Sequence, residues 1–101
     1  MGIARSQNGV PIRLPDERWI HITEEHSELA GHYFDVLETI EDPQAIYEGK
    51  AEELLAVRKV SPGKYLAVVY RELSEADGFV ITAFLTGRSA KLRRRKRLWP
   101  Q

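Results

Sequence analysis

Three histidines lie close together in the sequence, at His21, His26 and His32. Imidazole transfers protons near neutral pH, so a histidine beside a bound phosphodiester could serve as a general base or acid. His21 precedes Glu24 and Glu25 by three and four residues, a helical spacing at which a carboxylate can orient an imidazole, although the same spacing is common in surface pairs. His26 falls on an apolar stripe, where it could instead be a hydrogen-bonded core residue.

A metal site is the less favoured interpretation of these histidines. His21 and His26 are five residues apart, which places them about 140° apart around a helix, unlike the i, i+4 pair of zinc-binding helices. The chain has no cysteine, and this excludes disulfides, thiolate metal ligands and cysteine nucleophiles. We therefore expect neither a metal site nor a cofactor.

Two arginines could supply the positive charge that phosphate chemistry needs. A guanidinium fork matches phosphate oxygens and stabilises the charge that develops in phosphoryl transfer, so Arg58 and Arg71 are candidates. Thr82 could orient the phosphate through its hydroxyl, although threonine is common in strands for other reasons. Tyr65 is a candidate substrate contact. The alternative for the arginines is a solvated sheet face.

These side chains would be brought together by a sheet in the second half of the chain. A two-residue period with β-branched and aromatic residues predicts strands over about residues 52–60, 65–73 and 79–86. Alternating apolar residues around a proline also indicate a short edge strand over residues 10–14. Pro62 and Gly63 predict the turn between the first two strands. Pairing of Ser61 with Lys64 across that turn would place a polar set on one open face of the sheet, namely Arg58, Tyr65, Arg71 and Thr82.

Two helices are predicted to cover the other face. Pro15, Asp16 and Glu17 are typical of a first helical turn, and an apolar stripe follows them. A second helix is expected over residues 32–41, ended by Pro43. The expected fold is α+β: residues 1–87 form one domain, with two N-terminal helices packed on one face of an antiparallel meander of three to four strands, and residues 88–101 form a basic C-terminal tail.

The charge of the chain is zero overall but very uneven. Residues 88–97 carry seven basic residues and no acidic one, which leaves a net charge of −7 on residues 1–87. Closely spaced cations release counterions from nucleic acids, so the tail predicts an RNA or DNA partner. Folding of the tail onto the acidic body is the alternative. The candidate substrate-binding residues of the tail are Arg88, Arg93, Arg94 and Arg95.

No apolar run approaches the roughly 18 residues of a membrane helix, and the first residues do not resemble a secretory signal. We therefore expect a cytoplasmic protein with no membrane partner.

Several short motifs resemble a known nuclease group, and they are spread over residues 17–87. The chain is similar there to the phage-associated branch of the barnase, EndoU, colicin and RelE-like nuclease superfamily. The motifs that carry this resemblance are Arg18-Trp19-Ile20-His21-Ile22, His26-Ser27-Glu28, Glu38-Thr39-Ile40-Glu41-Asp42-Pro43 and Val80-Ile81-Thr82-Ala83-Phe84.

The resemblance implies metal-independent RNA cleavage, often by a bacterial toxin that a cognate antitoxin holds inactive. In such cleavage the ribose 2′-hydroxyl attacks the adjacent phosphate. The resemblance assigns proton transfer to His21 or His26, phosphate charge to Arg58 with Arg71, and positioning to Thr82. A non-catalytic nucleic-acid-binding module and a protein-interaction module of the same fold are the alternatives.

Overall fold

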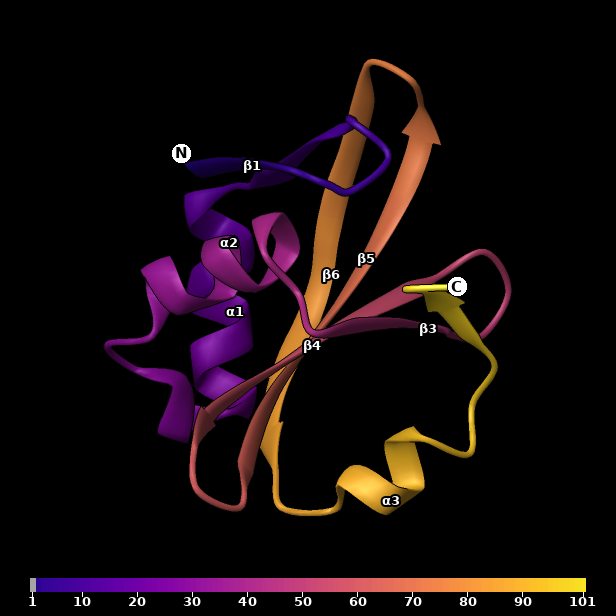
Figure 1. Cartoon of the computed structure of the whole chain (residues 1–101). Coiled ribbons are helices and arrows are strands. Elements are labelled where there is room, and N and C mark those ends of the chain that lie inside the picture. Colours follow the sequence, from indigo (N-terminus) through magenta and orange to yellow (C-terminus); the bar gives the residue numbers. More distant parts are fainter. Residues whose placement is uncertain (1) are drawn as a thin grey trace.

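The computed structural model describes residues 2–101, which form a single mixed sheet of seven strands in the order β1-β2-β6-β5-β4-β3-β7 (Figure 1). The elements in chain order are β1 (Gly2–Arg5), β2 (Pro11–Leu14), α1 (Asp16–Glu25), the 3-10 helix η1 (Ser27–Leu29), α2 (Tyr33–Glu41), β3 (Ala45–Glu48), β4 (Leu54–Ser61), β5 (Lys64–Ser74), β6 (Asp77–Thr86), α3 (Ser89–Leu92) and β7 (Arg97–Trp99).

The predicted fold was therefore wrong in the size and the type of the sheet. A meander of β4, β5 and β6 lies at its centre, but the β1–β2 hairpin extends one side and β3 with β7 extends the other. The sheet is mixed because β2 runs parallel to β6, with Ile12 opposite Gly78. The strand predicted over residues 10–14 is present as β2, but it lies between β1 and β6 and not at an edge. The other three added strands have only three or four residues each, too few to show a clear two-residue period.

The two long helices begin and end where local chemistry allows. Pro15 precedes α1, and Asp16 and Glu17 lie in its first turn, at the positive end of the helix dipole. α2 ends at Glu41, two residues before Pro43. Between the two helices Gly31 has a φ of +88°, a conformation that suits glycine and few other residues.

The register between β4 and β5 differs from the prediction by one residue. Ser61 does pair with Lys64 as expected, but a bulge follows between Lys59 and Ser61, so that Arg58 lies opposite Leu66 and Lys59 opposite Tyr65. A shift of one residue moves every later side chain to the other face of a strand. The expected open face with Arg58, Tyr65 and Arg71 was therefore wrong: Arg58 shares a face with Leu66, and the other two lie on the opposite face.

The sheet has an apolar cluster on each face. α1 and α2 lie against the first face, which we call the helix face, and α3 lies on the second face (Figure 1). The buried residues on the helix face include Ile12, Leu14, Ile22, Leu29, Val36, Ile40, Leu66, Val68, Tyr70 and Val80. The smaller cluster on the second face consists of Tyr47, Leu55, Val57, Ala67, Val69 and Leu92.

Residues 88–101, expected as a tail, join the sheet. Leu92 of α3 is buried in the second-face cluster, and β7 pairs antiparallel with β3, with Trp99 opposite Ile46. Glu48 N–H also donates to the Lys96 carbonyl at 2.8 Å. Residues 88–97, the basic segment, are thus anchored at both ends. Among residues 2–101, no helix has the length and apolar character of a membrane span.

Candidate functional site

Of the two predicted catalytic histidines, His21 lies within α1 and His26 directly follows it. His21 is an exposed residue of α1, and its Nε2 is 3.0 Å from the Glu25 carboxylate. His26 follows the helix, with Nδ1 3.6 Å from Glu28 and its ring centroid 6.4 Å from that of Phe84. Among the described residues, the side chain of His21 is paired only within its helix, whereas His26 also approaches a ring of the distant strand β6.

The other predicted site residues are divided between the two faces. Arg58 lies on the helix face, whereas Thr82 pairs with Val69 on the second face, which also carries Arg71 and Tyr65. Arg71 is held by Glu52 at 2.7 Å. Within residues 2–101, no hydrogen bond, ion pair or ring contact joins any two of the predicted catalytic residues, which are His21, His26, Arg58 and Thr82.

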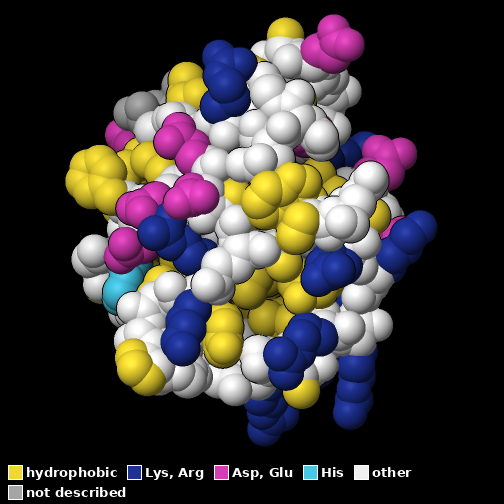
Figure 2. Space-filling view, viewed as in Figure 1, with side chains coloured by type: hydrophobic (Ala, Val, Ile, Leu, Met, Phe, Trp, Pro, Cys, Tyr) yellow, Lys and Arg dark blue, Asp and Glu magenta, His cyan; other side chains and the backbone are white. Residues whose placement is uncertain are grey.

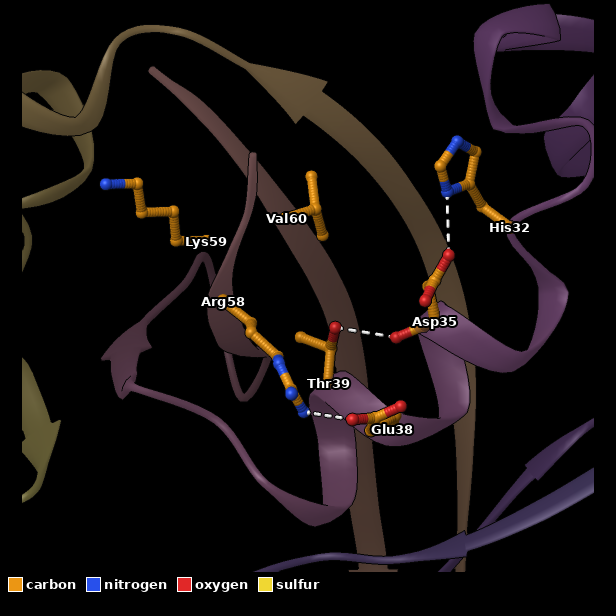
Figure 3. A pocket seen from close by; sticks show the side chains of 7 residues that line it. All are labelled: His32, Asp35, Glu38, Thr39, Arg58, Lys59 and Val60. Atoms are coloured by element: carbon orange, nitrogen blue, oxygen red, sulfur yellow. Dashed lines mark hydrogen bonds and ion pairs between the residues drawn. The ribbon is translucent and has the colours of Figure 1, made fainter. Parts of the chain in front are cut away.

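A cleft between α2 and β4 gathers another set of ionisable groups (Figure 3). Its volume is about 200 Å³. We call it the α2–β4 cleft, and it is lined by His32, Asp35, Glu38, Thr39, Arg58, Lys59 and Val60.

One end of this cleft holds an oriented imidazole. His32 is the N-cap residue of α2, and Asp35 lies three residues on, in the first helical turn. This spacing brings the two side chains together, with His32 Nδ1 2.8 Å from Asp35 Oδ2. Because Nδ1 faces a carboxylate, the Nε2 atom of His32 is left to meet a ligand.

The other end of the cleft holds the guanidinium of Arg58. Its Nη1 atom is 2.7 Å from the carboxylate of Glu38, in the C-terminal half of α2, and 3.6 Å from that of Asp42, the residue after the helix. Thr39 lies between the two ends, fully buried, with its hydroxyl donating to the Asp35 carbonyl at 2.7 Å. Figure 3 shows Lys59 pointing away from Arg58. The cleft therefore offers one imidazole and one guanidinium, each already paired with acids.

The prediction missed His32, Asp35 and Glu38 as site residues. The signal was present in the sequence, because residues at 32, 35 and 38 repeat every three positions and so lie along one side of a helix. What hid it was the bulge in β4, which brings Arg58 to that side. Among residues 2–101, no group of three or more acidic or histidine side chains has a geometry that could hold a metal ion.

The basic segment is free of internal acidic partners. All seven of its Lys and Arg residues are exposed, and within residues 2–101 none of them forms an ion pair with a carboxylate. The segment does fold back onto the body, as the alternative expected, but through Leu92 and β7 and not through ion pairs. Figure 2 shows Lys and Arg side chains around the lower part of one face, where Figure 1 places α3.

The basic segment adjoins the second face of the sheet. Arg93 and Leu92 line a small cleft of about 100 Å³ together with Tyr65 and Tyr47. Arg88 and Arg94 line a shallow hollow around α3. The predicted substrate-binding residues Tyr65, Arg88, Arg93 and Arg94 are thus close to α3, whereas Arg58 is on the other face. No family model, curated protein or solved structure matches the chain.

Proposed function

We propose that the chain binds RNA through the basic segment, with cytoplasmic RNA as its target. The observation that carries this proposal is the set of seven exposed cations from Arg88 to Arg97, none of which is neutralised by a carboxylate among residues 2–101. Nucleic acids bind such arrays because neutralised phosphates release their counterions. The choice of RNA over DNA is supported by the sequence resemblance to ribonucleases.

Anchoring at both ends makes this segment a better phosphate-binding surface than a free tail. Leu92 fixes α3 on the second face, and pairing with β3 fixes β7. Cations that are already held in place lose less conformational freedom when they meet a phosphate backbone. Arg93, Arg94 and Arg95 are consecutive and exposed, so they can meet successive phosphates or the two sides of one strand.

The test measures how binding of a single-stranded RNA depends on salt. Replacing Arg93, Arg94 and Arg95 with Gln should weaken binding and reduce the slope of log K against log salt by about 2, at roughly 0.7 for each phosphate contact. The matched control carries the same charge change elsewhere, in exposed cations that have no ion pair within residues 2–101: Arg18→Gln, Lys50→Gln and Lys64→Gln. Equal slopes for the two triple variants would reject the proposal, and a DNA arm tests the choice of nucleic acid.

A metal-independent endoribonuclease, acting as the toxin of a toxin–antitoxin pair, is a second candidate. The observation in its favour is the α2–β4 cleft, where Asp35 orients His32 and Arg58 could exchange Glu38 for a phosphate. His32 would move a proton while the 2′-hydroxyl attacks phosphorus and the bond to the 5′-oxygen breaks. Figure 3 places His32 and Arg58 at opposite ends of the cleft, so binding of RNA has the stronger support.

Cleavage is tested by incubating the purified protein with total RNA in EDTA. New ends with 2′,3′-cyclic phosphates that disappear in His32→Ala but persist in His21→Ala would establish this second activity, because His21 is paired with Glu25 outside the cleft. Growth arrest on expression, relieved by a neighbouring gene product, would identify the antitoxin partner. Intact RNA that is nevertheless bound would leave the chain as a binding protein.

A further inference from the structure

The helix face of the sheet is wider than its two helices can cover. A helix is about 10 Å wide and strands lie about 4.8 Å apart, so two helices cover roughly four strands. α1 packs mainly on β6, and α2 packs mainly on β1, β4 and β5. The region of β3 and β7 is left open, and a cleft of about 460 Å³ lies there. This Trp99 cleft is lined by Gln7, Asn8, Ile46, Leu54, Tyr70, Leu98, Trp99, Pro100 and Gln101.

Tyr70 is one of the residues that line this cleft. The side chain is fully buried, and the hydroxyl makes no hydrogen bond within residues 2–101. A buried polar atom without a partner costs the free energy of its lost hydration, which a ligand could restore. Burial and then the nearby Glu72 carboxylate raise the pKa of Tyr70 well above its ordinary value, so the hydroxyl keeps the proton it would donate.

Two amide side chains in the β1–β2 turn are held by their nitrogen atoms. Gln7 Nε2 donates to the Glu41 carbonyl at 2.7 Å, and Asn8 Nδ2 donates to the Glu72 carboxylate at 2.9 Å. The carbonyl oxygens of Gln7 and Asn8 are left without partners within residues 2–101. They can accept hydrogen bonds from a ligand that carries N–H groups.

Trp99 gives the cleft an aromatic wall, and its strand follows directly from the basic segment. Trp99 is partly exposed and packs against the helix-face core, so its ring can provide a flat surface. Aromatic faces bind unpaired nucleobases by stacking. Lys96 and Arg97 immediately precede Leu98 in the wall of the cleft, so a strand whose phosphates lie on the basic segment has a base within reach of it.

We propose that the Trp99 cleft binds one unpaired nucleobase with an exocyclic amino group, stacked on Trp99 and hydrogen-bonded to the amide oxygens of the β1–β2 turn and to Tyr70. Adenine, guanine and cytosine carry such an amino group and uracil does not. The cleft then gives the RNA-binding surface a preference among bases, and in this respect the inference rests on the proposed function.

The test follows the two indole N–H resonances by NMR, assigned with Trp19→Phe. Trp19 packs against Tyr33 outside the cleft and is an internal control. AMP, GMP and CMP should shift the Trp99 resonance at lower concentration than UMP, and the Trp19 resonance should stay in place. Ribose 5-phosphate should shift neither. A silent Trp99 resonance, or a response to ribose 5-phosphate equal to that of AMP, would overturn the proposal.

Tyr70→Phe tests the hydroxyl without harming the fold, because it removes an unpartnered polar atom. It should raise the Kd for AMP about threefold to tenfold, the worth of one hydrogen bond, with a Tm that is unchanged or higher. Tyr33→Phe, in α2 and outside the cleft, is the matched control and should bind as the wild type. Unchanged affinity in Tyr70→Phe counts against the site as described.

A trinucleotide distinguishes RNA from a free nucleotide as the source of the base. A trinucleotide with a central adenine should shift Trp99 at least as readily as AMP, and failure to do so would overturn a subsite for RNA. The outcome is independent of the salt experiment. Equal salt slopes for the two triple variants would reject the basic segment as the RNA-binding surface. A Trp99 resonance that does not shift with any nucleotide would reject only the base-binding site.

Discussion

The Arg58 guanidinium lies 2.7 Å from the Glu38 carboxylate and so ties the centre of the sheet to α2. This contact exists because a bulge in β4 turns Arg58 to the helix face, where Asp42 and its carbonyl oxygen also approach the guanidinium. Without the bulge the same residue would lie opposite Ala67 on the second face, away from α2. Arg58 therefore has a structural role that its position in the sequence does not reveal.

Replacement of Arg58 should cost more stability than replacement of Arg71. Both form an ion pair of 2.7 Å, but the Arg58 side chain is 30% exposed and has two carboxylate neighbours, whereas Arg71 is 43% exposed and has one. We expect Arg58→Ala to lower the free energy of unfolding by about 1–2 kcal/mol and Arg71→Ala by less than about 1 kcal/mol. Urea unfolding measures both, and equal losses would contradict this ranking.

Leu92→Ala should show whether RNA binding depends on how the cations are positioned as well as on how many there are. Leu92 is the residue of α3 that is buried in the second-face cluster, and its truncation leaves every charge of the basic segment in place. We expect faster amide exchange in α3 and weaker RNA binding, with an unchanged slope against salt, because the same phosphates are neutralised by a less ordered array. Ala90→Gly, at an exposed position of the same helix, is the comparison for a loss of helix propensity alone.

The central strands could be predicted from the sequence because their signals are local. β4, β5 and β6 are long, they alternate or are continuously apolar, and the Pro62–Gly63 turn lies between the first two. The register could not be predicted, because the extra residue near Val60 becomes visible only when Arg58 is seen to reach the acids of α2. The pairings of β2 with β6 and of β7 with β3 depend on contacts between distant residues.

The candidate sites were predictable in part. The basic segment follows directly from the charge distribution, but its anchoring by Leu92 and β7 does not. The Trp99 cleft joins the β1–β2 turn to residues 98–101, the two ends of the described chain, so no local motif indicates it. Histidine spacing drew attention to His21 and His26, while the histidine that faces a cleft is His32, whose partner Asp35 lies within the same helical turn.

Gly78→Ala should destabilise the pairing of β2, in the β1–β2 hairpin, with β6. A Cβ atom at this position would lie 2.6 Å from the Arg71 carbonyl oxygen and 2.6 Å from Ile12 Cδ1. Because one neighbour is backbone, the strands themselves must separate, and we expect a loss of about 1–3 kcal/mol in urea unfolding. Gly87→Ala, where the nearest atom is 3.3 Å away, should cost less. A smaller loss at position 78 than at position 87 would contradict the close approach of β2.

The ion pair between Arg13 of β2 and Asp77 of β6 should make the stability of the protein depend on pH. Arg13 Nε lies 2.8 Å from Asp77 Oδ1, and hydrogen bonds from Arg13, together with its charge, hold the pKa of Asp77 below its ordinary value. A lowered pKa in the folded state means that the stabilisation is complete above the unfolded value, about 3.9 for Asp, and is lost as pH falls through the lower folded value. The difference in unfolding free energy between wild type and Asp77→Asn should therefore be constant from neutral pH down to about pH 5 and should shrink below about pH 4. Glu75 is an exposed acid of the same turn without an ion pair in residues 2–101, so Glu75→Gln should show no such pH-dependent difference. If the difference in unfolding free energy between wild type and Asp77→Asn stayed constant down to the lowest pH, Arg13 would not be stabilising the Asp77 carboxylate.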